Sequence, residues 1–395
     1  MSPGLARRQL GPAQLHGCTL VLRPPRFSDF AQWRRLRLHD RKLIEPFWHS
    51  SPLTWAERHT ERHWVREVLE TRAFAREGKR LATVIEIDGR FAGQVEIGSI
   101  DPQLRQGEMG IWIDAALARH GFGGLAAGLI LDFGFDTLGL ERIIAPISPA
   151  NIAAAAGAME MGFVPEARMA QHFDVGGQRT DHLLYAVTRA ELPPKGFTDM
   201  WLERMLDRDD EPPRLGIPIL YETPGTAAVL GVSARFRAGQ LRRAVQRVLP
   251  AVPVSLPLPG YPRARLRSPL VSTGPRSPEG LLFHLEVDGR KAGEARLLDL
   301  DLFDRHARMQ IRADPARADD GVRLAATRAL LDHAVHGLGL FRVYSAIPAG
   351  DTESAAVAAR AGLLEEGIMR SYIGLDGSRG DHALWAVTAG GEHRA

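Results

Sequence analysis

The chain has 395 residues, of which 45% are hydrophobic and 25% charged, with a formal net charge of +3 and one cysteine. This composition is typical of a globular protein of two or three domains, and it excludes wholesale disorder and a disulfide scaffold. There is no apolar run of a membrane span's length, no basic run with interleaved aromatic residues and no apolar secretory signal. The sequence therefore predicts a cytoplasmic protein that binds neither membrane nor nucleic acid.

In the first part of the chain, the sequence pattern predicts strands on either side of a helical region. Residues 29–78 have the apolar spacing of helices. The dipeptide Asp88-Gly89 predicts a tight hairpin between two β-rich runs. The expected strands cover 19–23, 82–87, 91–98 and 109–114.

A glycine-rich turn, RHGFGG at 119–124, follows the last of these strands and opens a helix. The helix is indicated by apolar residues at i, i+3, i+4 and i+7 from Ala126 to Phe133. Because a strand at 142–147 comes next, it should run parallel to the strand before the turn, whereas the earlier strands are antiparallel. Later expected elements are a helix at 151–160 and a hairpin of 168–175 and 182–188. A mixed sheet with flanking helices is therefore predicted.

Three sequence blocks recur at an offset of 200 residues. LATVIEIDGRFAG from Leu81 resembles LLFHLEVDGRKAG from Leu281, and DHLLYAVT from Asp181 resembles DHALWAVT from Asp381. The third pair is LGLERIIAPI and LGLFRVYSAI. The chain is therefore predicted to hold two copies of one unit.

The join between the copies is expected in a segment rich in proline and charge, around 189–215. We place the first domain at 1–192, a linker with a short helix at 193–212, and the second domain at 213–395.

The first unit resembles the RimJ/RimL-type branch of the GNAT superfamily of N-acetyltransferases. The resemblance is carried by LVLRPPRFSDFAQW, MGIWIDAALARHGFGGLA (109–126) and SPANIAAAAGAMEMGFVPEA (148–167). It is weaker in the second unit, where it begins near 281. It implies an α/β (α+β) fold of two tandem GNAT-like units, each a mixed, mostly antiparallel twisted sheet flanked by helices on both faces.

The resemblance also implies acetyl-CoA as co-substrate, because the glycine loop of this family binds its pyrophosphate. The strand before the loop would pair with the pantetheine arm, and an asparagine would hydrogen-bond that arm. The implied cofactor-binding residues are Ile111, Trp112, Ile113, Arg119, His120, Gly121, Phe122, Gly123, Gly124 and Asn151. Position 154 is Ala where the family has serine, so the group that protonates the leaving thiolate stays open.

Two carboxylates are candidates for the general base that deprotonates the acceptor amine, Glu108 and Glu96. The alternative for each is a solvated carboxylate at the end of a strand. His59 and His63 are spaced i, i+4 but lack the glutamate of an HExxH motif, so no metal site is predicted.

The second unit differs from the first where acetyl-CoA would bind. Charged or bulky residues stand at the positions of the loop, the asparagine and Glu108: Asp319, Asp320, Arg323, Leu324, Asp351 and Arg308. We therefore expect a degenerate second copy that serves as a built-in partner in a monomeric pseudo-dimer.

The main prediction is an N-acetyltransferase whose acceptor is a protein N-terminal α-amine or a small amine. Two alternatives stay open. One is a non-catalytic acyl-CoA-binding or interaction module, and the other is a tandem acetyltransferase acting on a thiol precursor or an antibiotic.

Overall fold

The computed structural model describes residues 4–206, 222–248, 254–268, 280–374 and 377–390. Its helices are α1 (Phe30–His39), α2 (Arg41–Ile44), α3 (Glu61–Arg76), α4 (Phe122–Asp132), α5 (Ile152–Glu160), α6 (Gly196–Leu206), α7 (Thr226–Val248), α8 (Asp320–Asp332) and α9 (Thr352–Ala361). The strands of the first half are β1 (Leu10–Leu15), β2 (Cys18–Arg23), β3 (Leu81–Ile87), β4 (Arg90–Asp101), β5 (Gln106–Ile113), β6 (Arg142–Ile147), β7 (Val164–Val175) and β8 (Gln178–Thr188). Those of the second half are β9 (Ser255–Leu258), β10 (Tyr261–Arg267), β11 (Leu281–Val287), β12 (Arg290–Asp301), β13 (His306–Ala313), β14 (Arg342–Pro348), β15 (Leu364–Ile373) and β16 (Arg379–Thr388).

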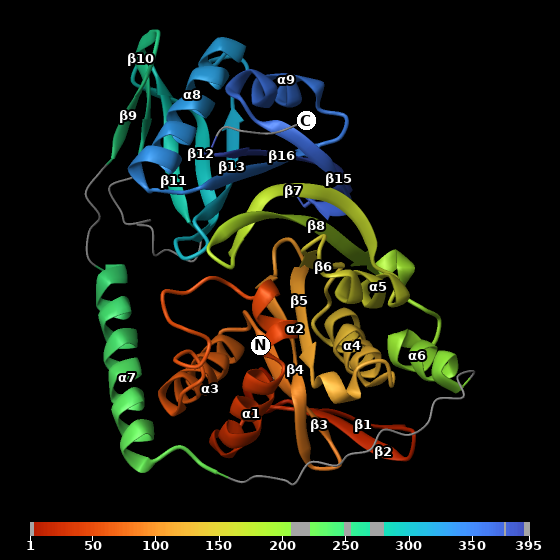
Figure 1. The fold of residues 1–395 in the computed structure, drawn as a ribbon. Helices are drawn as coiled ribbons and strands as arrows, with labels where there is room; N and C mark the ends of the chain where they lie inside the picture. Colours follow the sequence, from red (N-terminus) through yellow and green to blue (C-terminus); the bar gives the residue numbers. More distant parts are fainter. Residues whose placement is uncertain (1–3, 207–221, 249–253, 269–279, 375–376, 391–395) are drawn as a thin grey trace.

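In the described residues, sixteen strands form one continuous sheet (Figure 1). Its order is β1-β2-β3-β4-β5-β6-β8-β7-β15-β16-β14-β13-β12-β11-β10-β9. Neighbouring strands are antiparallel except for β5 with β6 and β13 with β14, which are parallel. This is the mixed, mostly antiparallel sheet that the sequence predicts.

The first half has helices on both faces of its sheet. Successive residues of a strand point to opposite faces. Accordingly, Ile85 packs into a core with α4, whereas its neighbour Val84 packs with Trp33 of α1 and Trp64 of α3. The hairpin predicted at Asp88-Gly89 joins β3 to β4.

The second half repeats the strand pairing of the first at an offset of 200. Gly98 pairs with Glu108 in the first half, and Leu298 pairs with Arg308 in the second. The halves differ before their third strands: residues 24–80 separate β2 from β3, but only 268–280 separate β10 from β11. Among the described residues, no helix of the second half takes the place of α1–α3.

The two halves meet where β7 pairs with β15. Arg142 of β6 binds the Glu166 carboxylate and donates to the Arg370 carbonyl oxygen across the junction at 2.9 Å. Arg342 of β14 likewise binds Glu366 and donates to a carbonyl of β7. Both arginines are buried, so their hydrogen bonds across the junction are shielded from solvent.

The predicted linker contributes to the packing of the first half. Its residues 196–206 form α6, which packs along α4, while α7 lies beside α3 (Figure 1). Residues 207–212 of the predicted linker and 213–221 of the predicted second domain lie outside the described residues.

Three strands are not anticipated from the sequence, namely β1, β9 and β10. Each extends an edge of the sheet through pairing with a neighbour. No helix in the described ranges is both long enough and apolar enough to cross a membrane.

Candidate functional site

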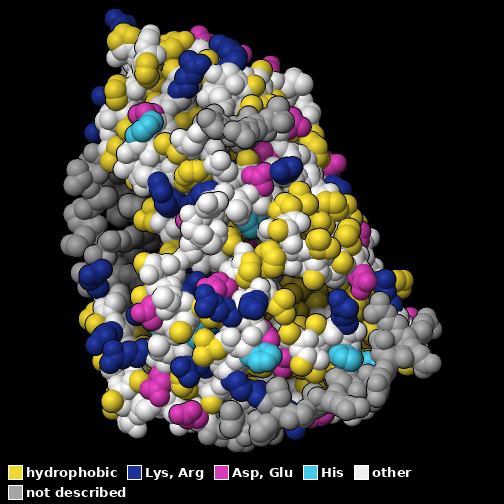
Figure 2. All heavy atoms as spheres, in the orientation of Figure 1, with side chains coloured by type: hydrophobic (Ala, Val, Ile, Leu, Met, Phe, Trp, Pro, Cys, Tyr) yellow, Lys and Arg dark blue, Asp and Glu magenta, His cyan; other side chains and the backbone are white. Residues whose placement is uncertain are grey.

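Strands β5 and β6 run side by side and then separate. They pair from Gln106 with Arg142 to Glu108 with Ile144, and the described ladder ends there. The rest of β5 therefore has a free backbone edge, which suits an extended ligand. Figure 2 shows a hollow bordered by hydrophobic side chains in this region, between β5, α4 and α5.

The predicted glycine loop leads directly into α4. Gly121 is the N-cap with φ +79°, and the first helical bond runs from the Leu125 N–H to the Gly121 carbonyl at 3.0 Å. The N–H groups in the first turn of a helix have no intrahelical acceptor, and the helix dipole favours an anion there. Arg119 is exposed and His120 half-buried beside this turn. The loop therefore has the geometry of an anion site.

The glycines of the loop serve different purposes. A Cβ on Gly124 would lie 2.1 Å from the Trp201 ring of α6, and a Cβ on Gly121 would lie 2.5 Å from the sulfur of Met205. A Cβ on Gly123 would meet only Ile113, at 3.9 Å. Two glycines are thus required by α6, whereas Gly123 leaves open space. Its φ is not positive, so a side chain at this position would not strain the backbone.

Two predicted cofactor residues have structural roles for their side chains. Phe122 is fully buried in the core, so only its backbone could meet a ligand. The Asn151 carboxamide oxygen accepts from the Ala154 N–H at 3.2 Å and caps α5. The NH2 group of Asn151 keeps its donors for other partners.

The predicted cofactor strand presents its side chains to two faces. Ile111 is 41% exposed, and Ile113 packs towards the core that contains α4. Trp112 points the other way, where its indole N–H donates to Gln94 at 3.0 Å.

Sequence reasoning missed Arg37 of α1. Its guanidinium lies 3.8 Å from the ring centre of Trp48 and 4.2 Å from that of Trp112. The side chain is buried, and burial lowers its pKa to about 9. This cation–π sandwich connects the loop after α2 to β5. No motif predicts it, because its three members are brought together only by the fold.

Glu108 lies where β5 and β6 separate, a place that we call the fork, on the last paired position of β5. It stands opposite Gly98, and Glu96 stands opposite Gly110, so each carboxylate faces a residue without a side chain. Residues directly opposite on neighbouring strands share a face of the sheet. Both carboxylates therefore lie on the face that α1 and α3 cover.

The two carboxylates have different partners. Glu96 accepts from the Arg80 guanidinium at 2.8 Å. Among the described residues, Glu108 has no ion pair or hydrogen bond from a side chain. Desolvation, followed by the charge of Glu96, raises the pKa of Glu108 to about 7. Glu108 is thus the better proton acceptor of the two near neutral pH.

His49 is a second residue that sequence reasoning did not place at the site. Its Nδ1 lies 3.2 Å from the Asp304 carboxylate of the second half, and that contact raises the pKa of His49. The charges of His49 and Asp304 also act on Glu108. No sequence pattern connects these positions, which belong to different halves of the chain.

In the second half, the corresponding fork is filled. Arg308 takes the place of Glu108 and bonds to Asp299 at 2.7 Å and to the Tyr372 hydroxyl at 3.0 Å. Leu298 and Gln310 replace the glycines opposite the two carboxylates.

The loop of the second half is closed as well. The Asp319 carboxylate caps α8 by accepting from the Val322 N–H at 2.8 Å. Arg323, at the position of Gly123, bonds to Ser354 of α9 at 3.0 Å. A side chain therefore bridges α8 and α9, whose counterparts α4 and α5 flank the hollow of the first half.

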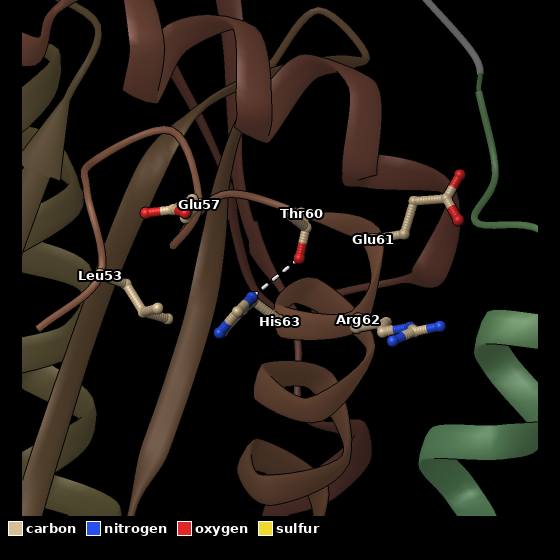
Figure 3. Close-up of a pocket in the computed structure, with 6 residues that line it drawn as sticks. All are labelled: Leu53, Glu57, Thr60, Glu61, Arg62 and His63. Carbon is tan, nitrogen blue, oxygen red and sulfur yellow. Dashed lines mark hydrogen bonds between the residues drawn. The ribbon is translucent and has the colours of Figure 1, made fainter.

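A separate surface pocket of 520 Å³ lies at the start of α3 (Figure 3). Its polar groups are engaged locally: His63 contacts the Thr60 hydroxyl at 2.8 Å, and Glu57 accepts from Thr54 at 2.7 Å. Glu61 accepts from the Gly225 N–H at 3.3 Å. These contacts fix the turn before α3 and bring no reactive groups together.

Comparisons with known proteins find an acetyltransferase domain in the first half. Residues 19–164 match the family model described as an acetyltransferase (GNAT) domain. Spermidine N(1)-acetyltransferase of Escherichia coli K12 is 32% identical over 95 residues, or 24% of this chain. The match spans 51% of that protein, so the chain corresponds to about half the length of this curated relative.

Solved structures similar to the chain include acetyltransferases with bound CoA. Mycobacterium smegmatis RimJ in complex with CoA-disulfide is 32% identical, with 52% of this chain and 97% of that chain covered and a TM-score of 0.49. RimL, a ribosomal L7/L12 alpha-N-protein acetyltransferase in complex with coenzyme A, is 18% identical, with 46% and 98% covered and a TM-score of 0.41. Residues 19–164 of this chain therefore form a GNAT acetyltransferase domain.

Proposed function

We propose that the first half is an acetyl-CoA-dependent N-acetyltransferase that transfers acetyl directly to an amine at the fork of β5 and β6. The observation that carries the proposal is the position of Glu108, at the last paired residue before the strands separate and opposite Gly98. A carboxylate with a pKa of about 7 can take a proton from an ammonium group near neutral pH.

The residues present fit acetyl-CoA as the second substrate. The first turn of α4 offers unpaired N–H groups to a pyrophosphate, with Gly123 leaving room for close approach and Arg119 adding charge. The free edge of β5 from Met109 onward would pair with the pantetheine arm. Asn151 would donate from its NH2 group.

The reaction proceeds without a covalent enzyme intermediate. Glu108 accepts a proton from the acceptor ammonium, and the free amine attacks the thioester carbonyl carbon. A C–N bond forms and the C–S bond breaks, so CoA leaves as a thiolate, and the second proton that the nitrogen loses passes through solvent to that thiolate. Backbone N–H groups at the free edge of β5 would stabilise the oxyanion.

The surroundings favour a positively charged acceptor. Asp301 and Asp304 act on Glu108 together with Glu96, so the region carries several carboxylates. A protein N-terminal α-amine or a small polyamine fits this charge, and both kinds of acceptor occur in the names of proteins similar to this chain.

The test is the pair Glu108→Gln and Glu96→Gln, assayed with acetyl-CoA and either spermidine or a peptide with a free α-amine. We expect Glu108→Gln to lower kcat roughly 10²- to 10⁴-fold while acetyl-CoA binding is retained. Protonated Glu108 cannot act as base, so the wild-type rate should rise with pH through about 7, and this inflection should vanish in the variant.

The control, Glu96→Gln, should keep an inflection but at a lower pH, because the charge of Glu96 contributes to the raised pKa of Glu108. A full rate for Glu108→Gln, with the inflection intact, would exclude Glu108 as the base. Binding of acetyl-CoA without transfer to either acceptor would favour an acyl-CoA-binding module.

A further inference from the structure

The turn between β12 and β13 reaches from the second half of the chain to the first. The Asp301 carboxylate accepts from the N–H groups of Phe303, at 2.7 Å, and Asp304, at 2.9 Å, which fixes the shape of the turn. Arg179 of β8 donates to the Asp304 carbonyl oxygen at 2.5 Å. In Figure 1 this turn lies beside the end of the β7–β8 hairpin.

His49 is held between the two halves. Its backbone forms a bridge with Val175, and its ring packs against Phe173 with centroids 5.1 Å apart. The second half supplies the other contacts: Phe303, with centroids 6.1 Å apart, and the Asp304 carboxylate at 3.2 Å from Nδ1. With Nδ1 facing Asp304, Nε2 is left for another partner, and the side chain is 42% exposed.

The equivalent turn of the first half, between β4 and β5, makes an apolar contact with the second half. Asp101 accepts from the N–H groups of Gln103 and Leu104, as Asp301 does in its own turn. Leu104, at the position of Asp304, is buried against Met369 and Tyr372 of the second half.

The turn between β4 and β5 thus docks on the second half with an apolar residue, Leu104. The turn between β12 and β13 instead carries a carboxylate, Asp304, whose side chain is only 14% exposed. Burying a carboxylate is costly unless it has a partner, and its partner here is His49. Packing of the two halves alone does not require this charge.

Resting on the function proposed above, we propose that the second half builds the acceptor side of the first half's site. Asp304 is a positioning residue that holds His49 beside Glu108, where Nε2 meets the incoming amine acceptor. The second half therefore contributes to acceptor binding although its own fork is filled. The first half on its own would lack two of the groups that hold His49.

Several charged groups face His49. Asp304, Glu108 and Asp301 raise its pKa, and His182 is near enough to sense its charge. Arg58 donates to the His49 carbonyl oxygen at 2.7 Å rather than to the ring. Asp304 is the largest cause, so its removal should produce the largest change.

The experiment uses the full chain with Asp304→Asn, Asp304→Glu and the control Asp332→Asn. Asp332 forms another His–Asp pair of the second half, 2.9 Å from His336, and both side chains are exposed. The His49 resonances, assigned with His49→Gln, are followed by NMR from pH 5 to 9. The acceptor KM and the acetyl-CoA KM are measured with spermidine and with a peptide carrying a free α-amine.

We expect Asp304→Asn to lower the pKa of His49 and to raise the acceptor KM about 10-fold, with the acetyl-CoA KM unchanged. Asp304→Glu should recover part of both effects, and Asp332→Asn should change neither. An unchanged His49 pKa in Asp304→Asn would refute the positioning role, and a lowered pKa with an unchanged acceptor KM would refute the place at the acceptor site. If the wild-type chain transfers no acetyl group, the proposed function fails, and the NMR titration with added spermidine decides this inference separately: spermidine must shift His49 in the wild type and not in Asp304→Asn.

Discussion

The three glycines at the start of α4 have different surroundings in the structure. Positions 124 and 121 require glycine, because Trp201 and Met205 of α6 occupy the space that a Cβ would need. A Cβ on Gly123 would meet only Ile113, at 3.9 Å, and would otherwise have open space around it. The resemblance assigned all three to one pyrophosphate loop, and the structure leaves Gly123 as the position where a ligand could come close to the backbone.

The first prediction concerns Gly123→Arg, which copies Arg323 of the second half. We expect the affinity for acetyl-CoA to fall at least ~10-fold, which corresponds to about 1.4 kcal/mol, because the new side chain crosses the space left for the pyrophosphate. The fold should be retained, since a Cβ fits and the backbone is helical. Titration calorimetry measures the affinity.

Gly231→Arg is the matched control, because Gly231 is an exposed helical glycine of α7 with open space around its Cβ position. It should bind acetyl-CoA normally. Equal affinities for Gly123→Arg and the wild type would remove Gly123 from the site.

Among the elements, α6 fixes the start of α4. Trp201 is 4% exposed and its indole N–H donates to the Gly121 carbonyl at 2.7 Å. At the other end of α6, the Phe197 and Thr198 N–H groups donate to the Asp132 carboxylate, which caps the helix. A helix beyond the first 192 residues therefore supports the candidate anion site.

The second prediction is that Trp201→Ala destabilises the protein by about 3–5 kcal/mol, the usual cost of removing a large buried aromatic side chain. Urea denaturation monitored by circular dichroism measures the change. Acetyl-CoA binding should weaken too, because the N-cap loses its hydrogen bond.

Leu206→Ala on the same helix serves as the control. Leu206 is 84% exposed, so its loss should change stability by less than about 0.5 kcal/mol. A cost below 1 kcal/mol for Trp201→Ala would mean that α6 is not essential to α4.

In the whole molecule, the halves share one sheet but not one set of site residues. A buried ion pair lies on each side of the junction of β7 and β15, Arg142 with Glu166 and Arg342 with Glu366, and each arginine donates to a carbonyl of the other half. The second half keeps this junction while its fork is closed by Arg308 and its loop by Arg323. The junction is therefore compatible with a second half that supports the first without binding acetyl-CoA.

The third prediction is that the full chain binds one equivalent of acetyl-CoA. Asp319 occupies a helical N–H group, Arg323 bridges α8 to α9, and both carboxylates at 319 and 320 would repel a pyrophosphate. Calorimetry on the intact chain gives the number of sites.

The double variant Asp319→Arg/Asp320→His should still bind one equivalent, because Arg323 keeps its bridge to α9. Two equivalents for the wild type would show that the second fork is open to the ligand.

The sequence by itself determined the local elements and their order. The Asp88-Gly89 hairpin, the turn at 119–124 with its helix, and the parallel strand after it depend on backbone preferences within a few residues, and all are present. The repeat at 200 residues also anticipated the matching registers of β4–β5 and β12–β13.

Only the tertiary structure decided what these elements contact. The roles of Gly124, Arg37 and Phe122 depend on side chains from α6, the loop after α2, β5 and the core, which no local pattern connects. The pair of His49 and Asp304 depends on how two halves of one sheet meet. Propensity and turn chemistry act over a few residues, whereas burial, ion pairing and pKa shifts arise between groups that only the fold brings together.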